Sequence, residues 1–200
     1  MTKRNRWSLG LLIVVFAAPY VVSWLLFNYA TFWRDGGADR HGQLIQPPRP
    51  LPNLALVDPS GKLHGARLHG KWTLVYVVRG ACDSACAGNL YRMRQLRLTV
   101  GRDALRVQRL LVVYGADPGA LLTPAQVHDF AGQLVASGAL LHESVAARSF
   151  RLGPDDHPFA AHRLYLVDPL GNLMMAYAPD TVPRGITDDL VRLLKYSRVG

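Results

Sequence analysis

Two apolar runs in the middle of the chain predict the core strands of a sheet. Trp72–Val78 and Val107–Tyr114 are rich in β-branched and aromatic residues. Runs of this length and composition are typical of strands covered on both faces. Between them, residues 84–99 lack proline and carry apolar residues at near-helical spacing. The pattern therefore predicts a strand–helix–strand unit over residues 72–114.

Shorter patterns on either side of this unit predict two hairpins. Leu54–Val57 pairs with the stretch after the Ser60-Gly61 turn, and Leu164–Val167 pairs with Leu173–Tyr177 around a turn at 168–172. Both turns are rich in Pro, Gly and Asp or Ser, which are the residues that reverse the chain direction.

Two further helices complete the predicted order. Thr123 and Pro124 have the residue types of an N-cap and a first helical position, and this helix is expected to run through Leu134 and Val135 to Gly138. Ile186–Tyr196 is amphipathic and closes the chain. The order β-α-β-α-β-β-α predicts an α/β domain with helices on both faces of its sheet.

The N-terminal part has a different pattern, in which Ser8–Phe27 forms a run of twenty residues without a charge. That length spans about 30 Å of hydrocarbon as a helix. Basic residues precede the run and no acidic residue occurs before Asp35, which predicts a cytoplasmic N-terminus. A cleaved signal peptide is the alternative, because Val15-Phe16-Ala17 resembles a cleavage site, but the apolar run continues ten residues further.

These features predict four segments. Residues 1–7 are a cytoplasmic basic flank, 8–27 a transmembrane anchor, 28–52 a tether rich in Gly, Pro and charge, and 53–197 the folded domain. The predicted location is the bacterial inner membrane, single-pass, with the C-terminal domain in the periplasm. That compartment is oxidising, so cysteines there can form disulfides.

The net charge of +9 is concentrated in two places. Three of the positive charges lie in the N-terminal flank. Many of the others lie in one stretch, namely Arg92, Arg94, Arg97, Arg102, Arg106 and Arg109. We interpret this stretch as a solvated helix face, or as a surface for an anionic membrane or an acidic protein. Nucleic acid is not an expected partner.

The only cysteines, Cys82 and Cys86, fall between the first core strand and its helix. Residues four apart share a helix face and are within reach of a disulfide. A helix N-terminus stabilises a thiolate; Arg79 adds positive charge there and Asp83 opposes it. These features favour a functional dithiol. A structural staple is the alternative, although closing so short a loop constrains the unfolded chain little.

At these residues the chain resembles the Sco family of cytochrome oxidase assembly proteins. The resemblance covers roughly residues 50–196 and rests on "LALVDPSGKLHGARLHGKWTLVYVVRGACDSAC" and "HRLYLVDPLGNLMMAY". It implies a thioredoxin-like fold of the peroxiredoxin/Sco type, anchored by one transmembrane helix. It also implies copper binding through the two cysteines and a histidine. The implied partner is oxidase subunit II or another oxidase assembly protein, served by copper delivery or by thiol reduction.

The chain departs from the family pattern at two positions. Ala87 follows the second cysteine where the family has proline, and Ala160 stands where the family has its histidine. His162 lies two residues further on. A shift of two keeps a strand side chain on the same face, so His162 is the candidate third ligand, with His157 as the alternative.

Two thiolates and one imidazole suit Cu(I), whereas zinc usually takes a fourth ligand. Thiol–disulfide exchange is the second hypothesis, with Cys82 attacking and Cys86 resolving. The Cys-x-x-x-Cys spacing and the absence of a proline before the last hairpin argue against a general oxidoreductase. A third hypothesis is an assembly scaffold with structural cysteines that docks through the arginine-rich helix.

Overall fold

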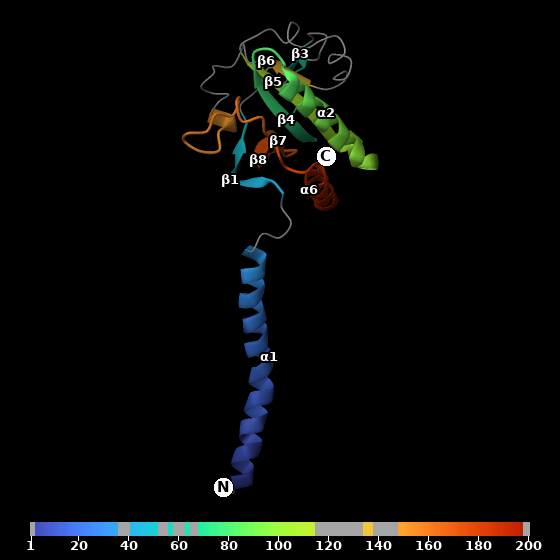
Figure 1. Cartoon of the computed structure of the whole chain (residues 1–200). Coiled ribbons are helices and arrows are strands. Elements are labelled where there is room, and N and C mark those ends of the chain that lie inside the picture. Colours follow the sequence, from blue (N-terminus) through green and yellow to red (C-terminus); the bar gives the residue numbers. More distant parts are fainter. Residues whose placement is uncertain are drawn as a thin grey trace. The chain divides into compact units, whose positions relative to one another are not determined.

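The structure is a computed structural model that describes residues 3–35, 41–51, 56–57, 63–64, 68–114, 134–137 and 148–197. The chain divides into two units, Met1–Arg40 and His41–Gly200. The first unit contains the helix α1 (Lys3–Asp35), drawn in blue in Figure 1, which includes the whole uncharged run. Within the described residues, no helix combines the length and the apolar character that crossing a bilayer requires.

The second unit is built on one eight-stranded sheet, whose strands follow the order β1-β8-β7-β4-β5-β6-β2-β3. The strands are β1 (Gln43–Pro50), β2 (Leu56–Val57), β3 (Leu63–His64), β4 (Trp72–Arg79), β5 (Val107–Tyr114), β6 (Leu134–Ser137), β7 (Leu164–Val167) and β8 (Asn172–Tyr177). The described helices of this unit include α2 (Ser84–Thr99), the 3₁₀ helix η1 (Gly101–Arg106) and α6 (Pro183–Tyr196).

Strand β4 lies at the centre of the sheet and sets its mixed character. It pairs in parallel with β5, with Val75 opposite Leu110, and antiparallel with β7, with Val75 opposite Tyr165. The parallel half continues to β6, and the antiparallel half continues through β8 to β1. The sequence prediction of an α/β domain is confirmed.

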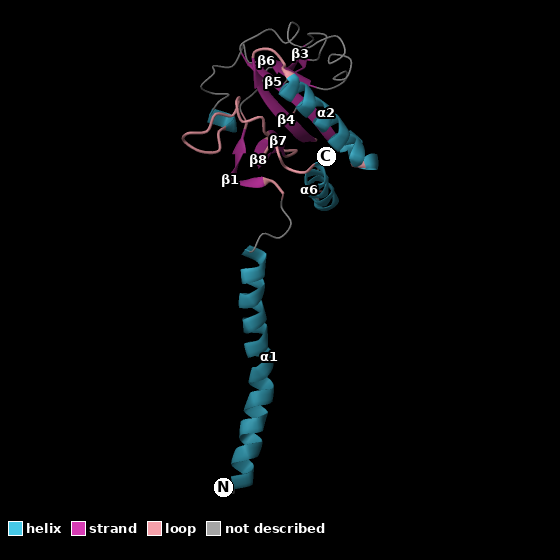
Figure 2. Cartoon of the chain, in the orientation of Figure 1, coloured by secondary structure: helices cyan, strands magenta, loops and turns pink. Residues whose placement is uncertain are grey.

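Successive side chains of β4 enter two separate apolar layers, because strand side chains alternate between the faces of a sheet. Leu74 and Tyr76 belong to the layer that contains α2 and α6. Figure 2 shows α2 lying across the strands of that face. Val75 and Val77 belong to the opposite layer, where Phe150 packs. Burial on both faces explains why this run carries almost no charge.

Two sequence predictions about element bounds are wrong. Gln43–Pro50, expected in the tether, forms β1 and pairs with β8, because Ile45 buries its side chain in the sheet. Leu134–Ser137, expected as the end of a helix, forms β6, which hydrogen-bonds β5 on one side and β2 on the other. Its apolar residues suit either a helix or a strand, and the pairing with β5 and β2 selects the strand. The preceding part of that predicted helix, from Thr123 to residue 133, lies outside the described residues.

The arginine-rich stretch is not one solvated face. Arg92 donates to the carbonyl oxygens of Pro179 and Thr181, and Arg97 donates to that of Val107. Arg106 donates to Asp103, Leu194 and Ser197. Arg109 lies on β5 and is only 4% exposed. Three of these side chains therefore bind groups within the domain and Arg109 is buried, while Arg94 and Arg102 are exposed.

Candidate functional site

The site begins with the turn that connects β4 to α2. Gly80 has φ +70°, a left-handed conformation that glycine adopts without strain, and its N–H donates to the carbonyl of Tyr114 at 2.9 Å. Asp83 then caps α2, since its Oδ1 accepts a hydrogen bond from the N–H of Cys86 at 2.8 Å. The turn and the cap together place both cysteines at the start of the helix.

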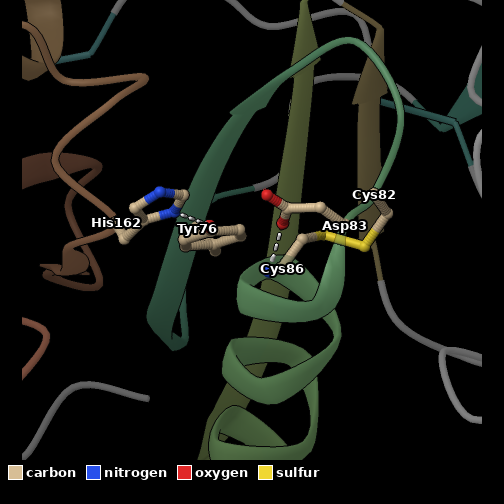
Figure 3. Close-up of a disulfide and its surroundings, with 5 residues drawn as sticks. All are labelled: Tyr76, Cys82, Asp83, Cys86 and His162. Atoms are coloured by element: carbon tan, nitrogen blue, oxygen red, sulfur yellow. Dashed lines mark hydrogen bonds between the residues drawn. A yellow bond between two sulfur atoms is a disulfide. The ribbon is translucent and has the colours of Figure 1, made fainter.

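Cys82 and Cys86 form a disulfide with their Cα atoms 5.2 Å apart (Figure 3). Cys86 is fully buried in the layer beneath α2, whereas Cys82 is half-buried and precedes the helix. A thiol from outside would therefore meet the sulfur of Cys82 first. The sequence did not establish the redox state of this pair, and the structure presents its oxidised form.

His162 lies next to Tyr76, and its Nδ1 is 2.9 Å from the Tyr76 hydroxyl. Asn89 of α2 donates from Nδ2 to the carbonyl oxygen of His162 at 3.3 Å. The imidazole and the disulfide lie on opposite sides of Tyr76 in Figure 3. Among the residues that the structure describes, no three His, Cys, Asp or Glu side chains gather closely enough to hold a metal ion.

Burial is the main cause that raises the pKa of Tyr76 above its ordinary value of 10.0. The Asp83 carboxylate adds to this rise, and the hydrogen bond with Asn89 opposes it. Tyr76 is therefore a neutral phenol at physiological pH, able to donate or accept a hydrogen bond beside the dithiol.

Tyr76 and Asn89 are site residues that the sequence interpretation missed. Tyr76 was counted as one more apolar residue of a buried strand, yet a buried hydroxyl needs a hydrogen-bond partner. Asn89 lies three residues after Cys86 on the buried face of the helix, where a polar side chain is unusual. Both residues are polar groups at positions expected to be buried, but the sequence does not identify their hydrogen-bond partners. His157, the alternative to His162, is exposed.

The arrangement supports two kinds of chemistry. As a disulfide, the pair accepts attack by an external thiolate at Cys82, which releases the sulfur of Cys86. After reduction, the pair offers two sulfur ligands at a helix N-terminus, where the free N–H groups stabilise thiolates.

The family model described as "Transmembrane-like, thioredoxin-like, C-terminal domain" matches residues 72–197, more than half of the chain. The chain belongs to this family. Its domain is accordingly thioredoxin-like, as the sequence resemblance implied. No match is found among curated proteins.

Solved structures of Sco proteins share this fold. Yeast Sco1 with copper bound is 21% identical, with a TM-score of 0.57 over 75% of this chain and 95% of that one. A SCO1/SenC family lipoprotein from Bacillus anthracis is 20% identical, with a TM-score of 0.54 over 74% and 98%. BsSco is described as a member of the Sco family of cytochrome c oxidase assembly proteins that contains a disulfide switch. It is 20% identical, with a TM-score of 0.51 over 76% of this chain and 96% of that one. At such identities the likeness establishes a Sco-type fold.

Proposed function

We propose that this protein is a membrane-anchored, periplasmic assembly factor for a respiratory cytochrome oxidase, and that it binds Cu(I) as its cargo through Cys82, Cys86 and His162. The observation that carries the proposal is the pairing of Cys82 with Cys86 at the start of α2, inside a fold shared with copper-binding Sco proteins. The expected partner is oxidase subunit II or another oxidase assembly protein.

Reduction of the disulfide precedes copper binding in this proposal. A disulfide holds no thiolate, so a thiol reductant must first supply two electrons and two protons. The two sulfurs then lose their protons on binding the metal. Two thiolates and an imidazole form a soft, three-coordinate set that suits Cu(I) and leaves one side open to an incoming ligand.

An anaerobic titration of the full chain in detergent with Cu(I), against a chromophoric Cu(I) chelator, tests the copper site. Reduced wild-type protein is expected to take one Cu(I) from the chelator, and the disulfide form to take none. Cys82→Ser/Cys86→Ser is the matched control. Equal Cu(I) binding by the wild type and the double variant would rule out the proposed site.

Support for the anchor comes from the sequence, which has twenty uncharged residues from Ser8 to Phe27 behind a basic flank. Carbonate washing of membranes from cells that express the full chain tests it. The protein is expected to remain in the membrane pellet and to be open to protease only from the periplasmic side. Release by carbonate would contradict the anchor.

Thiol–disulfide exchange is the second candidate, favoured by the unequal exposure of the two cysteines. In that case Cys82 attacks a partner disulfide and Cys86 resolves the mixed intermediate. Cys86→Ser is then expected to trap a partner on Cys82, visible on a non-reducing gel. If no adduct forms and the protein binds Cu(I), copper binding would be the only one of the two functions still supported.

A scaffold that docks through the arginines has little support, because four of the six are engaged within the domain.

A further inference from the structure

Leu105 and Tyr196 are the most exposed large apolar side chains that the structure describes in the second unit, each at 75%. Leu105 belongs to η1, and Tyr196 is the last residue of α6. Arg106 joins the two elements, because it donates to the carbonyl oxygens of Leu194 and Ser197 at 3.0 and 2.7 Å. The two exposed apolar groups therefore lie on neighbouring elements at one end of the domain.

Basic side chains lie beside both of these apolar groups. Arg102 precedes Leu105 by three residues, and residues three apart share a face of a 3₁₀ helix. The Nζ atom of Lys195 lies 5.6 Å from the centre of the Tyr196 ring. Arg102 and Lys195 are both exposed. We call these four residues the η1–α6 patch.

The acidic side chains of the same elements leave the patch basic. Asp103 is paired with Arg106 at 3.1 Å, and Asp189 is buried. Asp188 is exposed, but it lies two turns before Lys195 on α6. Exposed cations together with Leu and Tyr suit an anionic lipid surface, where the basic groups attract lipid phosphates and the apolar and aromatic groups enter the headgroup region.

The chain enters the second unit against the helix that carries Tyr196. The N–H groups of His41 and Gly42 donate to Asp189, two turns before Tyr196 on α6. Thirteen residues separate His41 from Phe27, the end of the proposed anchor, so the chain between them spans at most about 45 Å. The anchor thus keeps this end of the domain near lipid at a high effective concentration, which favours lipid over an acidic protein as the occupant of the patch.

We propose that the η1–α6 patch docks the domain on anionic phospholipids of the membrane that holds the chain. This inference rests on the proposed anchor and is independent of the copper site. Cys86 lies in the first turn of α2, and η1 follows the other end of this helix. A helix of 16 residues is about 24 Å long. Docking therefore turns the dithiol away from the lipid and toward proteins that project from the same membrane.

Hydrogen–deuterium exchange of the full chain in lipid nanodiscs tests the docking. Discs of phosphatidylcholine alone are compared with discs that also contain phosphatidylglycerol. On the anionic discs the amides of residues 101–106 and 191–196 should exchange more slowly, whereas those of the turn between β7 and β8 should not change. High salt should remove the difference, because it screens the attraction between exposed charges.

Substitutions within the patch and outside it sharpen the test. Arg102→Gln and Lys195→Gln should each reduce the protection by about fivefold, the effect of losing one basic group near an anionic surface. Lys71→Gln, at an exposed lysine just before β4, is the control for charge. Leu105→Ser should also reduce the protection. Leu170→Ser is its matched control, because Leu170 is 65% exposed in the turn between β7 and β8.

Three distinct results would overturn the inference. Equal exchange on both kinds of disc, with the protein still bound to them, would show that the domain does not dock on lipid. Protection in native membranes but not on protein-free anionic discs would identify a protein as the occupant of the patch. Elution of the full chain apart from the discs would refute the anchor and the docking with it. The Cu(I) titration tests the copper site separately, and the patch variants should match the wild type there.

Discussion

At the scale of single residues, Gly42, which directly precedes β1, shows how closely the chain approaches β8. A Cβ at this position would lie 2.6 Å from Cε1 of Tyr177, a buried ring on β8. The carboxylate of Asp189 on α6 accepts hydrogen bonds from the N–H groups of His41 and Gly42 at 3.1 and 3.3 Å. Residues 41 and 42, where the chain enters the domain, are therefore held between β8 and α6.

Gly42→Ala should therefore destabilise the domain. The buried ring has little room to move, so overpacking is expected to lower the free energy of unfolding by about 1–3 kcal/mol. Gly88→Ala is the control, because nothing lies within 4 Å of its Cβ position in α2. Replacing that helical glycine should raise stability by about 0.5–1 kcal/mol. Urea denaturation measures both, and equal effects would refute the close approach.

Asp156 stabilises the segment that leads to His162. It accepts hydrogen bonds from the N–H of Leu152 at 2.8 Å and from Arg163 at 2.7 Å. Burial tends to raise the pKa of Asp156, but these hydrogen bonds and the charge of Arg163 outweigh burial and hold the pKa below 3.8. The folded state therefore prefers the carboxylate more strongly than the unfolded chain does.

This preference predicts an acid-dependent loss of stability. The contribution of Asp156 is complete above pH 3.8 and is lost as the pH falls through its lower folded pKa. Asp156→Asn should lower the free energy of unfolding at pH 7 by about 1–2 kcal/mol and flatten its decline in acid. Denaturation between pH 7 and pH 3 measures this, with the exposed Asp155→Asn as control. A decline in Asp156→Asn as steep as in the wild type would contradict the assignment.

At the scale of elements, the start of α2 depends on its cap. Asp83 is the N-cap, and the N–H that it satisfies belongs to Cys86. The first turn of α2 contains no acidic residue, so within the cap and this turn Asp83 is the only acidic side chain. One side chain thus links helix stability to the placement of the dithiol.

Asp83→Ala should lower stability by about 1 kcal/mol, the usual loss when an N-cap is removed. Asp83→Asn keeps an oxygen that accepts the same hydrogen bond and should be close to the wild type. Hydrogen exchange at residues 84–87 locates the effect, with faster exchange in the alanine variant alone. Equal exchange in both variants would show that charge, and not the hydrogen bond, is what matters.

At the scale of the whole molecule, two apolar layers hold the sheet, and the disulfide closes only a short loop. Reduction should therefore leave the domain folded. The chain-entropy model predicts a loss of about 2 kcal/mol for a loop of this length. Thermal melts followed by circular dichroism, with and without a reductant, check this. Cys82→Ser/Cys86→Ser should match the reduced wild type, and unfolding on reduction would show that the disulfide has a structural role.

The strongest predictions from sequence concern local patterns. The bounds of β5 and the cores of β4, α2 and α6 follow from apolar periodicity and from the absence of proline, which act within a few residues. The same holds for the hairpin β7–β8, whose turn residues are visible in the sequence. The position of the two cysteines between a strand and a helix followed from these elements.

Tertiary contacts decided the rest. Leu134–Ser137 suits a helix or a strand, and pairing with β5 selected the strand. The proline-containing segment 43–50 resembles a linker in sequence, but it forms a strand because it pairs with β8 and buries Ile45. The contacts of His162 with Tyr76 and Asn89 join residues 86 and 73 positions apart. Periodicity is a property of neighbours along the chain, whereas pairing and buried hydrogen bonds depend on which distant groups the fold brings together.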